Sequence, residues 1–268
     1  MKSYGIIGWP LGHTMSPTLH NWGFEACGID ANYAAWPVSQ DDLSSFMGQV
    51  RARPISGLSV TIPHKQAIME HLDRISERAT TVGAVNTLYW DEDQLCGENT
   101  DVIGIVAPLT NLDTLPATAL VLGAGGAARA ALAGFKELGI PGIAIANRTH
   151  AKAVALSEEF AVECVAWEDR MDQSWALLCN TTPLGMSGAM EDATPWDGDR
   201  FAPATIAYDI VYNPLETRFL REARAAGCTT ISGLEMFLHQ GLAQFRLWTG
   251  TDMDESGART LLLNTLTA

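Results

Sequence analysis

Cysteine and histidine are sparse in this chain of 268 residues, and neither falls into a metal-binding pattern. The five cysteines contain no Cys-x-x-Cys pair, and the six histidines show no His-x-x-x-His or His-Glu-x-x-His spacing. Disulfide frameworks and zinc sites are recognised by such clusters. The sequence therefore predicts that the chain binds no metal and that its cysteines pack as small apolar side chains.

Positive charge is also in short supply. The chain has 17 lysines and arginines against 31 aspartates and glutamates, which gives a net charge of −14. Nucleic-acid binding needs a basic surface, so we exclude nucleic acid as a partner. Long-range attraction of an anionic substrate is disfavoured too, and a carboxylate ligand would have to be held by local hydrogen-bond donors.

Long apolar runs are missing as well. No stretch approaches the roughly 18 apolar residues that a membrane-spanning helix needs. Residues 1–8 lead straight into strand-like sequence without an apolar signal segment. We expect a cytoplasmic protein, a monomer or homodimer, that acts on a small molecule and has no membrane partner.

The most informative feature that is present is the glycine-rich segment 123–128. It matches the pattern G-x-G-x-x-A and lies between an apolar strand-like run at 119–122 and a helix-like run at 127–138. In this pattern the first glycine makes the tight turn, the second lets a pyrophosphate approach the backbone, and the third small residue allows close packing. The segment predicts dinucleotide binding by Gly123, Ala124, Gly125, Gly126 and Ala127, although an isolated match of this kind can be only a turn.

The residues after the next strand indicate which dinucleotide is bound. The strand-like run 143–146 ends at Asn147, where NAD-selective proteins usually carry an acidic residue that binds the ribose 2′-hydroxyl. Arg148 follows, and arginine pairs with a 2′-phosphate through two hydrogen bonds. Thr149 and Lys152 add a hydroxyl and a second cation, so we predict NADP as the cofactor.

Strand-like and helix-like stretches alternate along the chain, which is typical of an α/β fold. We expect two domains: an open α/β substrate-binding and catalytic domain formed by residues 1–103 and 235–268, and a Rossmann-type NADP-binding domain at 104–234. The C-terminal helices at 234–248 and 255–265 should return to the first domain. Further strands are expected at 4–8, 32–38, 57–62, 85–90, 94–97, 161–165, 176–180 and 205–211. Further helices are expected at 16–27, 41–51, 64–71, 77–81 and 100–109.

Polar residues outside the glycine-rich unit stand where core packing does not explain them. Thr14 and Ser16 precede a helix, where Ser16 could serve as a cap or both hydroxyls could bind a carboxylate. Thr61 and Lys65 follow a strand end, which is where open α/β sheets bind ligands. Asp101 opens a helix, so that capping and catalysis both remain open for it.

The chain resembles the shikimate dehydrogenase family along essentially its whole length. The segments that carry the resemblance are 8–21, 59–65, 84–88, 99–101, 123–129, 147–149, 180–186, 208–214 and 233–250. The resemblance implies reversible, NADP-dependent conversion of 3-dehydroshikimate to shikimate in aromatic amino-acid biosynthesis, an oxidoreductase reaction at a CH–OH group. By the same resemblance, Lys65 and Asp101 form the catalytic acid–base pair.

The resemblance also implies the remaining site residues. Thr14 and Ser16 would hold the substrate carboxylate, and the other substrate-binding residues would be Thr61, Asn86, Tyr212 and Gln240. On the nicotinamide side the cofactor would meet Thr182, Pro183, Leu184, Gly233 and Met236, while Asn147, Arg148, Thr149 and Lys152 would hold its 2′-phosphate.

Two departures from the family pattern leave substrate choice open. Thr14 stands where the family usually has serine, and its extra methyl narrows the carboxylate site. Ser59 stands where the family often has asparagine, so a contact there is lost or replaced by water. A quinate/shikimate dehydrogenase of broader range is therefore an alternative. A non-catalytic NADP-binding regulatory protein is another, although a pure binder has no need of both Lys65 and Asp101.

Overall fold

The computed structural model describes residues 1–12, 14–52 and 55–267. The chain divides into two compact units. Unit 1 consists of residues Met1–Asp101 and Leu238–Ala268, and unit 2 of residues Val102–Phe237. In the described part of the chain no helix is long and apolar enough to cross a membrane.

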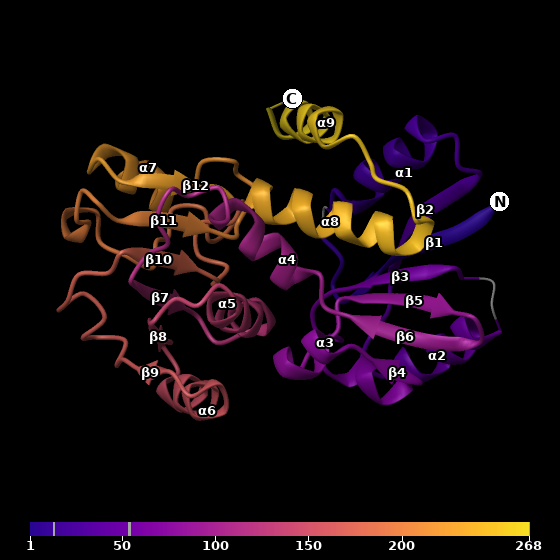
Figure 1. The fold of residues 1–268 in the computed structure, drawn as a ribbon, viewed down its shortest axis with the longest axis horizontal. Helices are drawn as coiled ribbons and strands as arrows, with labels where there is room; N and C mark the ends of the chain where they lie inside the picture. The colour runs from indigo at the N-terminus through magenta and orange to yellow at the C-terminus, as the bar shows by residue number, and fades with distance from the viewer. Residues whose placement is uncertain (13, 53–54, 268) are drawn as a thin grey trace. The chain divides into compact units, whose positions relative to one another are not determined.

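Unit 1 is built on a mixed sheet of six strands in the order β2-β1-β3-β5-β6-β4 (Figure 1). Strand β1 pairs in parallel with β2 and β3, whereas β5 runs antiparallel to both β3 and β6. A two-residue turn at Glu92 and Asp93 joins β5 to β6, as expected for this acidic stretch. The strand bounds are β1 Lys2–Gly8, β2 Ala31–Pro37, β3 Gly57–Val60, β4 Arg74–Ile75, β5 Thr87–Asp91 and β6 Gln94–Glu98.

The helices of unit 1 begin and end largely as the sequence predicts. They are α1 Ser16–Ala26, α2 Leu43–Arg51, α3 Glu77–Val82 and α9 Glu255–Thr267, with a short 3-10 helix η1 at Ala67–His71 in place of the longer helix expected at 64–71. Ser76 caps α3 by accepting a hydrogen bond from the Ala79 amide, and Gly83 ends it in the left-handed conformation. The apolar faces of the sheet and α2 meet in one buried cluster that includes Ile7, Leu58 and Val60.

Two helices contain residues of both units. Helix α4 spans Asp101–Val106 and is followed by a 3-10 turn, η2, at Ala107–Leu109, while α8 spans Gly233–Thr249. From Leu238 onward the chain belongs to unit 1, where α9 packs against α1. The prediction that the C-terminal helices return to the first part of the chain is confirmed.

Unit 2 is built on a sheet of six parallel strands in the order β12-β11-β10-β7-β8-β9 (Figure 1). The strands are β7 Thr118–Leu122, β8 Gly142–Ala146, β9 Glu163–Cys164, β10 Leu177–Asn180, β11 Ile206–Asp209 and β12 Thr229–Ile231. From Ala119 to Leu122 every side chain of β7 is fully buried, as its continuous apolar run requires for a central parallel strand. The predicted fold class, with one open α/β sheet and one Rossmann-type sheet, is confirmed.

Three helices of unit 2 alternate with its strands. They are α5 Gly126–Glu137, α6 His150–Phe160 and α7 Arg218–Ala225, and a 3-10 turn, η3, lies at Gly198–Arg200. The sequence analysis located α5 but did not predict α6, α7 or the short strands β4 and β12. Helix α7 begins at a Thr217 cap, whose hydroxyl accepts from the Leu220 amide.

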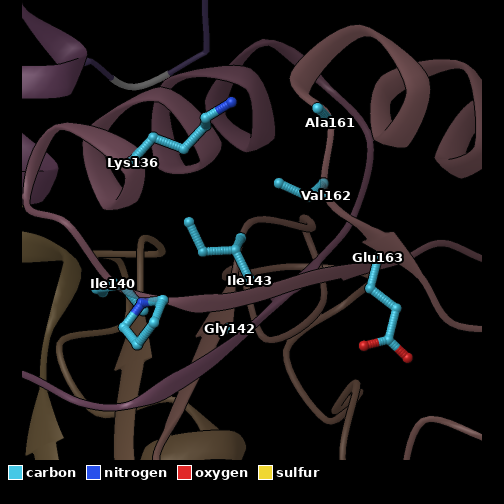
Figure 2. A pocket seen from close by; sticks show the side chains of 8 residues that line it. Lys136, Ile140, Gly142, Ile143, Ala161, Val162 and Glu163 are labelled. Atoms are coloured by element: carbon cyan, nitrogen blue, oxygen red, sulfur yellow. The ribbon is translucent and has the colours of Figure 1, made fainter.

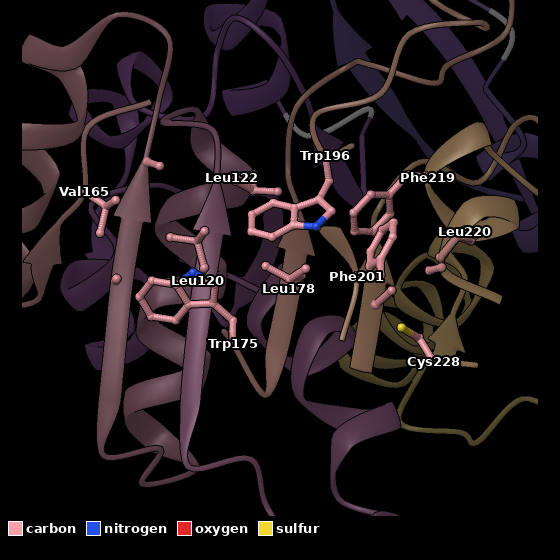
Figure 3. Close-up of a cluster of buried hydrophobic side chains, with 14 residues drawn as sticks. Leu120, Leu122, Val165, Trp175, Leu178, Trp196, Phe201, Phe219, Leu220 and Cys228 are labelled. Carbon is pink, nitrogen blue, oxygen red and sulfur yellow. The ribbon is translucent and has the colours of Figure 1, made fainter. Parts of the chain in front are cut away.

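One face of the unit 2 sheet carries an aromatic core (Figure 3). Trp196 and Phe219 are almost completely buried there, and the ring of Phe201 lies between them at centroid distances of 6.3 Å and 5.5 Å. Aromatic rings bury large apolar areas, so this cluster is a main source of unit 2 stability.

Truncation of this core should destabilise unit 2 strongly. We expect Phe219→Ala to lower the free energy of unfolding by about 3–5 kcal/mol, because it removes a fully buried ring and leaves a cavity. Leu115→Ala is the control, since Leu115 is 41% exposed and its truncation should change stability by about 0.5 kcal/mol or less. Denaturant titration of the full-length variants measures both, and equal losses would contradict the assignment of this core.

Candidate active site

Lys65 and Asp101 meet in unit 1 although they lie 36 positions apart in the sequence. Lys65 Nζ donates to Asp101 Oδ2 at 2.5 Å, and the two side chains are only 17% and 7% exposed. Lys65 follows β3 and Asp101 follows β6. Both strands run antiparallel to β5, so their carboxyl ends lie at the same edge of the sheet. The structure therefore brings together the two residues that the sequence analysis named as a catalytic pair.

Asn86 completes the environment of the Asp101 carboxylate. It immediately precedes β5, at the same edge of the sheet, and its Nδ2 donates to Asp101 Oδ1 at 2.8 Å. The Thr100 amide donates to Asn86 Oδ1 at 2.7 Å, which fixes the orientation of the Asn86 side chain. Each oxygen of Asp101 is thus bound by a different donor, and Asp101 is itself the first residue of α4.

Thr14 and Ser16 lie side by side before helix α1. Thr14 Oγ1 donates to Ser16 Oγ at 3.2 Å, and Ser16 is 4% exposed. The cap position of α1 is Met15, which makes no side-chain cap, and Ser16 is already the first residue of the helix. The interpretation of Ser16 as a helix cap is therefore wrong, and its hydroxyl remains available for other partners.

The other predicted substrate residues of unit 1 are Thr61, which follows β3, and Gln240, which lies on α8. Thr61 directly follows β3, and its amide donates to the Ile7 carbonyl at 2.9 Å. Gln240 is half-buried on α8. The Ser59 hydroxyl accepts from Tyr33 at 2.7 Å and donates to Gln244 at 2.8 Å, so it is engaged inside the protein.

In unit 2 the glycine-rich segment forms the turn that the sequence predicts. Gly123 has a φ of +115° and leaves no room for a side chain, because a Cβ there would lie 2.7 Å from Thr181 Oγ1. Gly125 is the cap of the 12-residue helix α5, and a Cβ there would meet nothing within 4 Å. Ala124, Gly126 and Ala127 are partly exposed around it. The helix N-terminus therefore presents open, donor-rich backbone, which fits a phosphate group.

The end of β8 carries the residues predicted to recognise a 2′-phosphate. Asn147 Nδ2 donates to the Thr149 carbonyl at 2.9 Å and shapes the turn into α6. Arg148, Thr149 and Lys152 are exposed, and no acidic residue lies between Asn147 and Lys152. This surface fits a phosphate dianion and disfavours recognition of a ribose hydroxyl by a carboxylate.

A buried polar network shapes the loop that follows β10. Asn180 accepts from Thr182 at its Oδ1 and donates from its Nδ2 to the Leu184 carbonyl at 3.1 Å and to Asp209 Oδ1 at 2.9 Å. Asp209, at the end of β11, also accepts from Thr217 at 2.6 Å. The two loops that follow β10 and β11 are therefore tied together. The sequence analysis gave a site role to Thr182 and its neighbours but none to Asp209, which lies inside the strand predicted at 205–211.

Three further predicted residues lie near the start of α8. The ring of Tyr212 lies 4.8 Å from that of Phe237, and Met236 is 9% exposed. Gly233 is required by packing, because a Cβ there would lie 2.3 Å from the Ile210 carbonyl oxygen. Packing alone therefore requires glycine at position 233, whether or not a cofactor binds there.

A cavity of about 390 Å³ in unit 2 lies away from these residues (Figure 2). It is lined by Ile140, Gly142 and Ile143 at the amino end of β8, and by Val162 and Glu163 at the start of β9. Ligands of open α/β sheets bind at the carboxyl ends of the strands, so this cavity is not the cofactor site. Within the described ranges no cluster of three potential metal ligands occurs.

Taken separately, the units carry the two components of a dinucleotide-dependent oxidoreductase. Unit 1 has a partly buried lysine–carboxylate pair that can exchange a proton, and unit 2 has a strand-to-helix turn that can hold a pyrophosphate. Comparison with known proteins identifies the family. Residues 6–88 match the model of the shikimate dehydrogenase substrate binding domain, and residues 233–263 match that of the shikimate 5′-dehydrogenase C-terminal domain.

Relatives similar over the full length agree with these matches. A shikimate dehydrogenase (NADP(+)) of Maridesulfovibrio salexigens is 53% identical, with 99% of this chain and 97% of that protein covered. The chain belongs to the shikimate dehydrogenase family. Shikimate 5-dehydrogenase from Thermus thermophilus, solved in complex with NADP(H) and shikimate, is 38% identical with a TM-score of 0.90, covering 99% of this chain and 100% of that one. Quinate dehydrogenase from Corynebacterium glutamicum, in complex with NAD, is 31% identical with a TM-score of 0.90, covering 98% and 99%.

The stability of unit 2 should depend on pH through Asp209. Burial raises the pKa of this carboxyl from 3.8 to about 7, against the opposing hydrogen bonds from Thr217, Val211 and Asn180. The folded chain therefore binds more protons than the unfolded chain between about pH 4 and pH 7, and this contribution to stability is lost as the pH rises through that window.

We expect the free energy of unfolding of Asp209→Asn, relative to the unsubstituted protein, to rise between about pH 4 and pH 7 and to level off above it. Denaturant titration at a series of pH values measures this difference. Thr205→Val is the control, because it removes the buried hydrogen bond to the Trp175 carbonyl without removing a titrating group. A pH-independent difference for Asp209→Asn would contradict the raised pKa.

Proposed function

We propose that this chain catalyses the reversible, NADP-dependent conversion of 3-dehydroshikimate to shikimate, with Lys65 and Asp101 as its acid–base pair. The observation that carries the proposal is the 2.5 Å contact between Lys65 Nζ and Asp101 Oδ2, in a chain of this family. A pair that is largely removed from water can hold a proton at a defined position beside a substrate oxygen.

When bound, NADPH would supply a hydride to the substrate carbonyl carbon, and NADP⁺ would accept it from the carbinol carbon in the reverse direction. The proton at the carbinol oxygen is the part of the reaction that belongs to the protein. Lys65 donates this proton in the direction of reduction and accepts it in the direction of oxidation. Asp101 orients the Lys65 ammonium group, and Asn86 fixes the carboxylate from its other side.

Hydroxyl groups hold the substrate in this proposal. Thr14 and Ser16 bind the carboxylate by hydrogen bonds, which suits a protein of net charge −14 because no positive field is needed. Thr61, Asn86, Tyr212 and Gln240 serve as the remaining substrate-binding residues.

The proposed cofactor residues follow the carboxyl ends of the unit 2 strands. The turn at 123–127 holds the pyrophosphate, supported by the open space at Gly125 and the N-terminus of α5. Asn147, Arg148, Thr149 and Lys152 bind the 2′-phosphate. The nicotinamide side is lined by Thr182, Pro183, Leu184, Gly233 and Met236, with the first three shaped by the Asn180 hydrogen bonds.

Use of quinate is the second candidate function. Thr14 carries a methyl group beside the proposed carboxylate site, and one of the similar structures is a quinate dehydrogenase. A purely NADP-sensing role is a weaker alternative, because it gives no reason for the close Lys65–Asp101 pair.

A cytoplasmic location and a monomeric or homodimeric state are also proposals. All five cysteines are unpaired, and thiols stay unpaired in reducing compartments. Light scattering on the purified protein measures the oligomeric state.

Replacement of Lys65 should abolish most of the activity. We expect Lys65→Met to lower kcat for shikimate oxidation by about 10²–10⁴-fold, since a positioned acid–base group contributes about that much. The measurement is NADPH or NADH formation with shikimate or quinate and NADP⁺ or NAD⁺, in all four pairings. Lys2→Met is the control because Lys2 is exposed at the start of β1. Faster turnover of quinate would favour the second candidate, and NADP⁺ binding without turnover would favour the sensing role.

Replacement of Arg148 should weaken NADP selectively. We expect Arg148→Ala to raise the KM for NADP⁺ by about 10–100-fold, because it removes charge-assisted hydrogen bonds to the 2′-phosphate. The KM for NAD⁺ should change less than about twofold by the same reasoning. Arg221→Ala, at an exposed position of α7, is the matched control. Equal losses for the two cofactors would contradict the assignment of Arg148 to the 2′-phosphate.

A further inference from the structure

Gln244 is a buried amide on α8 that the catalytic scheme above does not use. It is 1% exposed and reaches the sheet of unit 1 between β3 and β5. Its Oε1 accepts from Ser59 Oγ at 2.8 Å, and its Nε2 donates to Thr87 Oγ1 at 3.0 Å. A buried amide whose oxygen and nitrogen both have partners has one fixed orientation. A flip of the Gln244 amide would bring its N–H donors against the donating hydroxyl of Ser59.

The bonds beyond Thr87 lead to the catalytic carboxylate. Thr87 Oγ1 donates to Asn86 Oδ1 at 2.8 Å, and Asn86 Nδ2 donates to Asp101 Oδ1 at 2.8 Å. Each group accepts from the one before it and donates to the one after it. All donors therefore point toward Asp101, and hydrogen bonds aligned in this way strengthen one another in a low-dielectric interior.

The bonds beyond Ser59 lead to Tyr33. Tyr33 Oη donates to Ser59 Oγ at 2.7 Å. Burial raises the pKa of the Tyr33 phenol. One hydrogen-bonded series of side chains thus joins Tyr33 to Asp101 through Ser59, Gln244, Thr87 and Asn86.

His20 is a third partner, after Ser59 and Thr87, that fixes the orientation of the Gln244 amide. The ring is fully buried, and burial lowers its pKa to about 3, so it is neutral. Its Nε2 lies 3.3 Å from Gln244 Oε1, which can only accept, so Nε2 carries the ring hydrogen. The imidazole also stacks on Tyr33 at a centroid distance of 4.6 Å.

We propose that Gln244 is a positioning residue that holds Thr87 and Asn86 so that the Asn86 amide keeps facing Asp101. The inference rests on the proposed function, because Asp101 must be the catalytic carboxylate for its orientation to affect turnover. Gln244 itself touches no substrate in this scheme. Its loss should therefore lower kcat while leaving cofactor binding unchanged.

The experiment compares Gln244→Met with Trp248→Phe in the full-length protein. Methionine matches glutamine in length but has no amide, so both halves of the series are disconnected. Trp248 is one helical turn further along α8. Its replacement by phenylalanine removes the 2.9 Å bond from Nε1 to the Leu88 carbonyl and alters ring contacts with Tyr4, His20 and Tyr33, but it removes no hydrogen bond of the series. We expect kcat with shikimate to fall about five- to tenfold in Gln244→Met, the equivalent of one or two buried hydrogen bonds, with the KM for NADP⁺ unchanged. Trp248→Phe should lose stability but keep kcat.

A second pair tests the series if Gln244→Met fails to fold. Thr87→Val preserves shape but removes the hydroxyl, whereas Thr87→Ser keeps it. We expect kcat to fall in Thr87→Val and to be restored in Thr87→Ser.

Three outcomes would overturn the inference. Equal kcat in Gln244→Met and the unsubstituted protein would give the amide a structural role only. Equal loss of kcat in both Thr87 variants would show that the hydroxyl is not what matters. An unsubstituted protein that oxidises neither shikimate nor quinate would overturn the proposed function itself, a result distinguishable from a slow variant of an active enzyme.

Discussion

The hydrogen-bonded ion pair between Lys65 and Asp101 is the interaction on which the candidate site of unit 1 depends. Two charges that are largely removed from water persist only when their remaining hydrogen-bonding capacity is met. Asn86 meets it at Asp101, Thr100 orients Asn86, and the sheet brings the three segments to one edge because β3 and β6 run in the same direction. The order of the strands, rather than any local motif, thus creates the pair.

In unit 2 the direction of the strands also brings polar residues to one edge of the sheet, but the strand order is different. All six strands are parallel, so the carboxyl ends of neighbouring strands lie along one edge, and Gly123, Asn147, Asn180 and Asp209 all end up there. The buried Asp209 accepts hydrogen bonds from the neutral groups of Asn180, Thr217 and the Val211 amide. Desolvation consequently dominates the pKa of Asp209.

The elements that were predicted from the sequence are those with strong local signals. The apolar run at 119–122, the glycine-rich turn and the alternation of strands and helices each follow from the residues concerned. Helix α7 was missed because its sequence, RFLREARA, has only eight residues, and β4 and β12 because two or three residues show no period. Ser16 was open to a capping role, which only the bounds of α1 removed.

The sequence by itself determined the fold class, the dinucleotide-binding turn and the preference for a phosphate-binding surface at 147–152, because these depend on residues that are close along the chain. Only the tertiary structure decided which distant side chains share a hydrogen bond. In the sequence alone, Gln244 is an ordinary residue of a predicted α-helix, and Ser59 is a departure from the asparagine that the family often has. They become partners because α8 packs on the sheet of unit 1 and brings together positions 185 residues apart. Hydrogen bonds act over about 3 Å, and only the packed chain sets such distances between remote segments.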